Sequence, residues 1–229
     1  MDAPLPARPA PLHPARREAH PDRPAPRRGA GAASAPPSRL RTGRVVLGGL
    51  ALWAALVTAG AALGLFRALP TPLVPVPVVV GLGGLLLAYR LSRPFRSWVE
   101  TADLRALTLF HAWRIPAGVA FLVLGAQGAV PPLFAMLAGW GDVLAGLLAL
   151  GAPLWHGRSR SRRWYTAFHL FGMADFVVAV GTGFAYSVTG EPLMDAVKVL
   201  PLAVVVGFGV PVTGAFGLMT LDRLRRAGR

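Results

Sequence analysis

Three charged residues lie inside long apolar runs of this sequence: Arg114, Asp142 and Asp175. At a rise of about 1.5 Å per helical residue, they fall roughly 12 to 18 Å from one end of their runs. A charged side chain at the centre of a bilayer costs about 2.5 to 3.5 kcal/mol, so it rarely faces lipid. The sequence therefore predicts that Arg114 pairs with one or both aspartates inside a helical bundle.

The chemistry of this polar cluster follows from its formal charge. One guanidinium (+1) and two carboxylates (−1 each) sum to −1, so a proton, a cation or a substrate amine could complete it. His111 and His169 lie nearer the ends of their own apolar runs and extend the polar set. Two interpretations remain open. The cluster either locks helices together, or it lines a pathway or binding site for a proton, an ion or a small solute.

Small residues surround Asp142 on one face of its predicted helix. They recur at helical spacing on both sides of the aspartate, namely Ala135, Ala138, Gly139, Ala145, Gly146 and Ala149. Small residues let helix backbones approach closely in membranes. Asp142 is therefore expected to face a neighbouring helix and not lipid.

The segment Gly139-Trp140-Gly141-Asp142 resembles the GxGD motif of intramembrane aspartyl proteases, the presenilin-like and prepilin peptidases. The resemblance implies a second aspartate that shares a proton with the first, for which Asp175 is the candidate. Three features depart from those families. Asp175 follows the motif where theirs precedes it, no Pro-Ala-Leu motif follows, and Arg114 would hold both carboxylates ionised. A membrane-embedded protease is thus one alternative function, although the motif is short.

The two histidines suggest a second alternative, a haem-binding redox subunit. His111 and His169 each lie about five residues from the same end of a predicted span, so they could reach one depth. Histidines on facing helices can supply both axial ligands of a b-type haem. No HxxH or HxxxD spacing and no cysteine is present, so the sequence predicts no further cofactor and no metal site.

Six apolar runs of about 20 residues set the fold class, because that length crosses a hydrocarbon core of roughly 30 Å. They cover residues 45–66, 73–89, 106–126, 132–154, 164–187 and 197–220. The expected fold is an all-α polytopic membrane protein, with a six-helix transmembrane domain over residues 43–229. Residues 1–42 hold ten prolines with many arginines and alanines, a composition typical of a disordered tail.

The basic residues predict the topology. Of the 24 lysines and arginines, 23 are arginine, and they cluster at residues 8–44, 90–105, 158–163 and 223–229, all on one side of the predicted spans. The positive-inside rule assigns that side, with both termini, to the cytoplasm. A composition rich in arginine, alanine and glycine indicates a GC-rich bacterial genome, and hence the bacterial inner membrane.

Topology also accounts for the net charge of +14, so nucleic acid is not an expected partner. The expected partner is the lipid bilayer. A second copy of the chain and other membrane subunits are further candidates.

Two features predict departures from straight transmembrane helices. The stretch RPFRSWVETADLRAL places Phe95, Trp98 and Val99 on one face of an amphipathic helix, which is expected at the membrane interface. Pro116 and Pro211 lie inside predicted spans, and each frees the carbonyl four residues earlier. Bends are therefore expected in both spans.

Across the last four spans, the sequence resembles a family of small bacterial multi-pass membrane proteins of uncharacterised function. The residues that carry this similarity are Arg114, Pro132, Ala138, Gly139, Gly141, Asp142, Gly172 and Asp175. The resemblance implies an inner-membrane location and a shared polar core, but no activity. The expected function is a small ion, proton or solute transporter, or an accessory membrane subunit, in preference to an enzyme.

Overall fold

A computed structural model describes residues 37–152 and 158–228, and this part of the chain is helical and contains no strand. The helices are α1 (Pro37–Ala62), α2 (Pro75–Leu91), α3 (Arg93–Thr101), α4 (Leu104–Leu109), α5 (Arg114–Ala126), α6 (Pro132–Leu150), α7 (Arg158–Val188), α8 (Leu202–Val204) and α9 (Val210–Arg226). Tighter 3-10 turns join them, namely η1 (Leu65–Ala68), η2 (Thr71–Leu73), η3 (Phe110–Trp113) and η5 (Pro192–Lys198). The segment η6 (Val205–Gly209) is a wider π-helical turn.

Within the described residues, six helical stretches are long and apolar enough to cross a membrane, which confirms the predicted number. They cover Leu40–Ala62, Thr71–Leu91, Leu104–Ala126, Pro132–Leu150, Arg162–Val188 and Leu202–Arg226. The first ends earlier than predicted, because Gly64 takes a left-handed φ of 75° that ends the helix before η1. The sixth starts later than predicted, because the residues up to Lys198 form η5.

The predicted disordered tail falls largely outside the described residues, which begin at residue 37. Its last part, residues 37–42, is helical and belongs to α1. The helix therefore starts before the boundary that composition predicted at residue 42. The predicted end of the fourth span, at 154, also lies outside the described residues.

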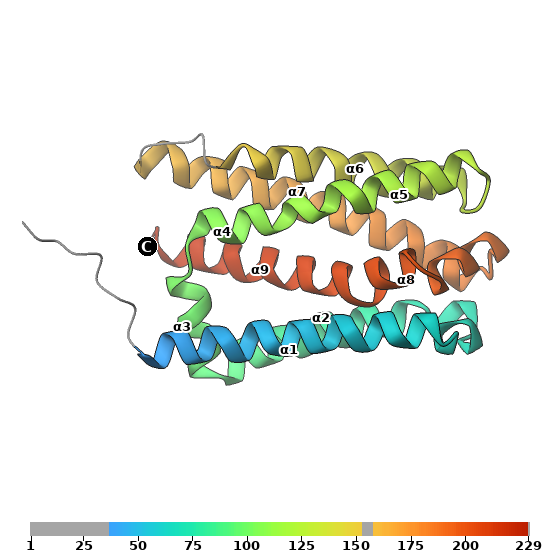
Figure 1. The fold of residues 1–229 in the computed structure, drawn as a ribbon. Coiled ribbons are helices and arrows are strands. Elements are labelled where there is room, and N and C mark those ends of the chain that lie inside the picture. The colour runs from blue at the N-terminus through green and yellow to red at the C-terminus, as the bar shows by residue number, and fades with distance from the viewer. Residues whose placement is uncertain (1–36, 153–157, 229) are drawn as a thin grey trace, which may run out of the picture. The chain divides into compact units, whose positions relative to one another are not determined.

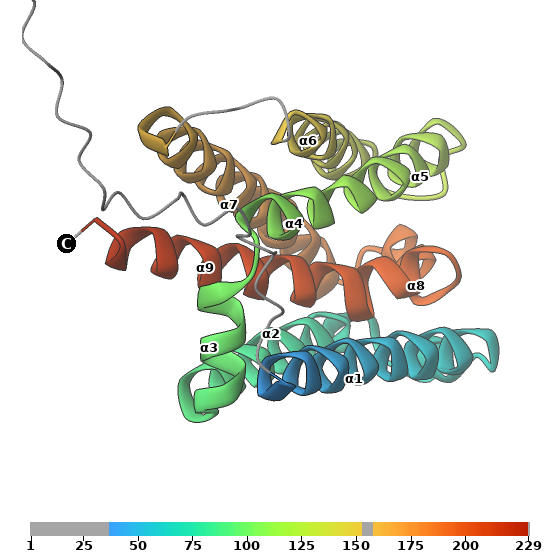
Figure 2. The same cartoon turned by 60° about the vertical axis from the view of Figure 1, so that its left-hand side comes forward.

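The last helix is the centre of the bundle. In Figures 1 and 2, α9 runs between the pair α1 and α2 on one side and the group α5, α6 and α7 on the other. Of its most apolar window, 72% is buried, against 17% for the first span and 11% for the second. The outer helices therefore present most of their apolar side chains to the surroundings.

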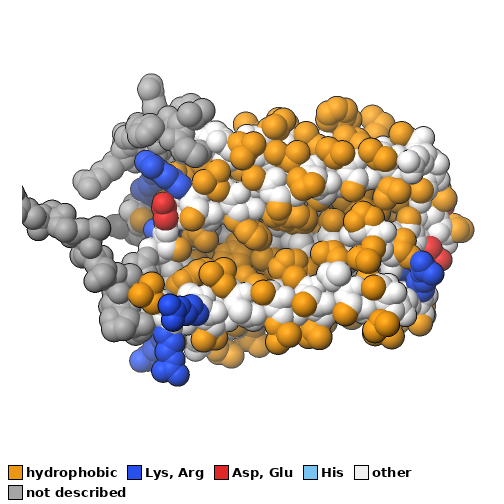
Figure 3. Space-filling model, in the orientation of Figure 1, with side chains coloured by type: hydrophobic (Ala, Val, Ile, Leu, Met, Phe, Trp, Pro, Cys, Tyr) orange, Lys and Arg blue, Asp and Glu red, His pale blue; other side chains and the backbone are white. Residues whose placement is uncertain are grey.

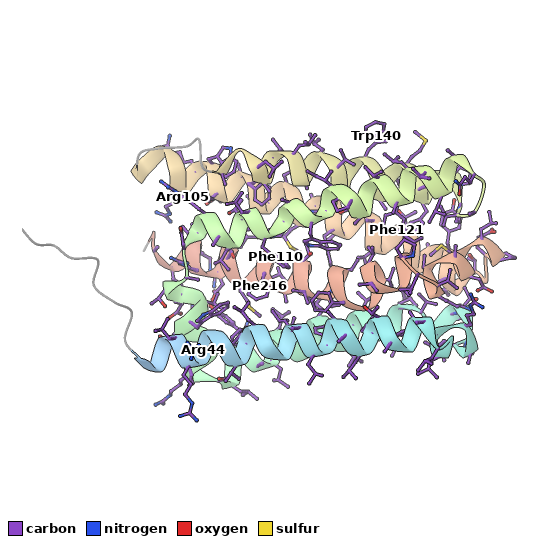
Figure 4. The ribbon with its side chains drawn as sticks, in the orientation of Figure 1. Arg44, Arg105, Phe110, Phe121, Trp140 and Phe216 are labelled. Carbon is purple, nitrogen blue, oxygen red and sulfur yellow. The ribbon has the colours of Figure 1, made fainter. Side chains whose placement is uncertain are left out.

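That outer surface has the pattern expected of a protein within a bilayer. Figure 3 shows apolar side chains covering the middle of the molecule, with charged side chains gathered at its two ends. Arg44 and Arg105 lie at the end where the described chain both begins and stops (Figure 4). We call this the arginine-rich end, and the opposite one, which carries Lys198, the Lys198 end.

The predicted amphipathic helix forms as α3 at the arginine-rich end. Ser92 caps it, since its hydroxyl accepts a hydrogen bond from the Phe95 N–H at 3.3 Å. Phe95 and Val99 are buried, and the helix packs against α1, α2 and α9. Arg223 of α9 donates hydrogen bonds to the Val99 carbonyl at 3.1 Å and to the Ala102 carbonyl at 2.6 Å. The α3 helix is thus fixed to the bundle on its apolar face.

A small polar cluster closes the Lys198 end. The Lys198 side chain is only 6% exposed, and its ammonium lies 2.7 Å from an Asp195 carboxylate oxygen and donates a hydrogen bond to the Thr71 hydroxyl at 2.9 Å. Thr71 in turn donates to Asp195 at 2.6 Å. The hydrogen bonds from Lys198 and Thr71 lower the pKa of Asp195. This cluster ties η2 to η5, and so joins the start of the second span to the segment before the sixth.

Candidate functional site

The structure brings Arg114, Asp142 and Asp175 together from α5, α6 and α7. The Arg114 Nε–H donates a hydrogen bond to Asp142 Oδ1 at 2.6 Å, and its Nη2–H donates to Asp175 Oδ2. The side chains are 4%, 15% and 9% exposed, respectively. Both aspartates pair with the arginine, which is the fuller of the arrangements that the sequence allowed. We call these three residues the triad.

Close backbone contact between α5 and α6 brings Arg114 within reach of Asp142. The predicted small face of α6 is buried at all its positions, namely Ala135, Ala138, Gly139, Ala145, Gly146 and Ala149. A Cβ placed on Gly118 of α5 would lie 2.5 Å from the Gly139 carbonyl oxygen and 2.9 Å from the Asp142 Cβ. Larger residues at this crossing would push the two helices apart.

The absence of a side chain at Gly141 lets Asp175 of α7 approach α6 closely. A Cβ placed on Gly141 would overlap the Asp175 carboxylate, so the carboxylate occupies the space that a side chain would take. Asp175 therefore lies directly against the α6 backbone, one residue before Asp142. The GWGD segment thus positions both aspartates, Asp142 through its own side chain and Asp175 through the absence of one at Gly141.

Two interruptions of regular helix flank the triad. Arg114 follows η3, and Pro116 two residues later has no N–H to bond the Ala112 carbonyl. On α9, Pro211 likewise leaves the Gly207 carbonyl without its usual donor, and η6 spans that position. The predicted bends therefore take the form of a tightened 3-10 turn and a widened π turn, and π turns are frequent at functional sites.

A side-chain hydrogen bond joins the two interruptions. The Trp113 indole N–H donates to the Thr213 hydroxyl at 3.1 Å. The indole ring packs on Gly209 of η6, where a Cβ would overlap it. The two irregular turns are thus coupled directly, next to the arginine.

Replacing Thr213 with valine, a nearly isosteric change, should remove only the acceptor for the Trp113 N–H. A buried donor left without a partner costs about 1 to 3 kcal/mol, so we expect a loss of about 1 to 2 kcal/mol of stability in detergent. Thr220→Val on the same helix is a matched control, because the buried Thr220 hydroxyl has no hydrogen-bond partner among the described residues. The control should be neutral or stabilising. Equal losses in the two variants would contradict a role for the hydrogen bond.

Two residues of the triad, Arg114 and Asp142, line a cavity. This cavity has a volume of about 370 Å³ and is lined by residues of α2, α5, α6, α7 and α9, with Arg114 and Asp142 among them. The remaining walls are mainly apolar, and the aromatic members are Trp113, Phe121, Phe134, Phe176 and Phe184. Phe121 and Phe134 contact each other edge to face, with ring centroids 5.3 Å apart. The arrangement suits a molecule with an apolar body and a polar group.

The histidines lie on the other side of the arginine. The rings of His111 and His169 are 5.3 Å apart between centroids, and the Thr108 hydroxyl lies 3.4 Å from His169 Nε2. A cavity of about 10 Å³ borders both rings and Gly172, and a Cβ on Gly172 would lie 3.5 Å from Arg114 Nη1. Both histidines are almost fully buried. They therefore extend the polar interior from the triad towards the arginine-rich end.

This histidine geometry does not fit a haem. A porphyrin plane has to lie between its two axial rings, whereas these rings are in edge-to-face contact, and the cavity that borders them has room for about one water molecule. As they lie here, His111 and His169 would not supply both axial ligands of one haem.

The aspartates do not fit a protease dyad either. Such a dyad needs two carboxylates that share a proton, whereas here the guanidinium of Arg114 bonds one oxygen of each aspartate. Trp140, inside the GxGD match, is 60% exposed and points away from the bundle (Figure 4). The motif instead serves the packing and charge pairing described above.

Comparison with known proteins identifies a family. Residues 71–225 match the family described as a domain of unknown function, DUF8737. The match extends from η2 to α9 and contains the whole triad. No curated protein and no solved structure matches the chain.

Proposed function

The chain belongs to the DUF8737 family, and we propose that it is a small transporter of the bacterial inner membrane that carries a solute through its central cavity. One observation supports this most directly, namely that the cavity ends on Arg114 and Asp142. Its volume of about 370 Å³ lies within the usual range for ligand sites. A triad that only locked helices together would not need an open volume of this size beside it.

The helix interruptions support movement as well as binding. Secondary transporters commonly hold their solute near the middle of the bilayer, beside helices that are broken there. Here the 3-10 turn before Arg114 and the π turn before Val210 border the cavity, linked by Trp113 and Thr213. A change at either turn would reach the other through this contact, and would alter both the cavity wall and the triad.

We further propose that the arginine-rich end faces the cytoplasm, with the start of α1 and the end of α9 on that side. The support is the positive-inside rule, because the arginine clusters border this end and Lys198 lies at the other. In this orientation the triad lies between the cytoplasmic, arginine-rich end and the periplasmic, Lys198 end. During transport the cavity would have to open to each of these ends in turn.

The absence of cysteine from the chain allows a direct test by accessibility. Ala179→Cys places a thiol in the cavity wall of α7. In oriented vesicles, a cationic thiol reagent that cannot cross the bilayer is added to one face or to the other. Transport predicts that this position reacts from both faces, because the cavity opens alternately to each side.

Two further single-cysteine variants serve as controls. Thr189→Cys, exposed near the Lys198 end, should react only from the periplasmic face, which also tests the proposed orientation. Leu147→Cys, exposed on the apolar outer surface of α6, should react from neither. If Ala179→Cys reacts from one face only, or from neither, the cavity does not cross from side to side and the transporter proposal fails.

A further inference from the structure

The chemistry of the cavity points to the class of its ligand. We propose that it binds a lipophilic ammonium, that is, a singly charged cation with an aromatic or aliphatic body, whose charged group lies against Asp142. This inference rests on the proposed function, since it names the solute that the cavity holds.

The orientation of the triad presents negative charge to the cavity. Asp142 lines the cavity and is the most exposed of the three side chains, at 15%. Its Oδ1 accepts the hydrogen bond from Arg114, whereas its Oδ2 accepts none from the described residues. This second oxygen is thus open to a ligand that donates a hydrogen bond.

The positive charge of the triad is directed elsewhere. Two nitrogens of Arg114 are engaged by the aspartates, and the third, Nη1, lies next to Gly172, 3.5 Å from the position that a Cβ would take there. Arg114 also lines the main cavity, but its side chain is only 4% exposed, against 15% for Asp142. An anionic ligand in the main cavity would therefore approach a carboxylate before it could reach the arginine.

Charge balance favours the same ligand. With Arg114 bound to two carboxylates, the formal charge of the triad is −1, and an uncompensated charge is costly at this depth. A bound ammonium would bring the sum to zero. Aromatic rings also attract cations at their faces, and five aromatic side chains line this cavity.

The walls and the opening call for a lipophilic body. Val79 of α2 and Val177 and Phe184 of α7 line the cavity and are at the same time more than half exposed on the apolar outer surface. The cavity therefore reaches the lipid-facing surface between α2 and α7. A molecule that partitions into the bilayer could approach Asp142 by this route, whereas a strongly hydrated ion would meet only apolar side chains there.

The test compares three probes with one body and different head groups. Phenylbutylamine, phenylbutanol and phenylbutanoate, each radiolabelled, are bound at neutral pH to the protein in nanodiscs of zwitterionic lipid, with binding to empty nanodiscs subtracted. We expect the amine to bind roughly tenfold more tightly than the alcohol or more, and the carboxylate to bind most weakly. Ala179→Phe, which fills the cavity, should reduce binding of the amine and of the alcohol.

Asp142→Asn then separates charge from shape. This variant keeps an oxygen for Arg114 and leaves the arginine paired with Asp175, so it should fold, and unchanged affinity for the alcohol would show that it does. The preference for the amine should disappear. If the alcohol or the carboxylate binds as tightly as the amine in the wild type, or if Asp142→Asn keeps the amine preference, the inference is overturned.

Failure of this inference can be told apart from failure of the proposed function. Equal affinities for the three head groups would remove the ammonium specificity while the two-sided reactivity of Ala179→Cys still stood. Conversely, a clear preference for the amine together with labelling from one face alone would leave a lipophilic amine-binding protein that does not transport.

Discussion

Arg114→Met, which keeps an unbranched side chain but not the charge or the guanidinium, is expected to lower the free energy of unfolding by about 3 to 5 kcal/mol. The reason is that Asp142 and Asp175 would both remain buried without a cation. The change is measured as a large fall in melting temperature in detergent, or in the denaturant concentration at the unfolding midpoint.

The matched control is a triple variant, Arg114→Met with Asp142→Asn and Asp175→Asn. It has the same arginine deletion but no buried charge, so it should recover most of the lost stability. If the triple variant is as unstable as Arg114→Met alone, the packing of the arginine side chain matters and its charge does not.

The geometry also predicts a smaller loss of stability when only one aspartate loses its charge. Because Arg114 bonds both, Asp142→Asn leaves a neutral Arg114–Asp175 pair and an amide oxygen in place of the carboxylate oxygen. The expected cost of about 1 to 2 kcal/mol is that of a weakened hydrogen bond to a charged group. The sequence left open whether Arg114 pairs with one aspartate or with both. From sequence alone, Asp142→Asn could therefore also have removed the only partner of Arg114.

Gly141→Ala is expected to destabilise the protein by about 3 kcal/mol, at the upper end of the range for overpacking. Its methyl group would overlap the Asp175 carboxylate, which would have to move away from both α6 and Arg114. Thermal unfolding in detergent measures the loss, and double substitution with Asp175→Asn should show that the two effects are coupled.

A second glycine provides the control for helix propensity. Gly84 in α2 has nothing within 4 Å of the position of a Cβ, so Gly84→Ala should be neutral or stabilising by up to about 1 kcal/mol. If Gly141→Ala behaves like Gly84→Ala, Asp175 has an alternative position, and the close contact is not required.

The triad could be predicted from sequence because few residues can compensate a charge inside a bilayer. Arg114, Asp142 and Asp175 are the charged groups that fall deep within the predicted spans. Because an unpaired charge there is costly and no other candidate partner is available at that depth, the three residues are expected to pair with one another. The small face of α6 was equally readable, since six small residues recur at helical spacing around Asp142. Features of this kind, which are rare or strictly periodic, can be recognised in a single sequence.

The cavity was beyond prediction for a physical reason. In a soluble protein, hydrophobic periodicity separates the core from water, but in a membrane both the lipid-facing and the cavity-facing sides of a helix are apolar. Phe134 lines the cavity and Trp140 is exposed on the outer surface, but both are large apolar residues of α6, so the sequence does not show which of them faces lipid. Nothing in the sequence near Lys198 indicates its hydrogen bond to the Thr71 hydroxyl, because the two residues lie 127 positions apart.

The boundary of the family match has a consequence for how the chain is inserted. The match begins at residue 71, so α1 lies outside it and the matched part contains an odd number of apolar crossings. Thr71 is held at the Lys198 end, opposite the arginines that follow α2. Because α1 precedes the matched part, Arg41 and Arg44 lie on the same side as those arginines. Arg67 is the only basic residue in the sequence between the first two crossings. In the proposed orientation, the two helices would enter the membrane together as a hairpin that translocates a single arginine, and would so set the direction of every later crossing.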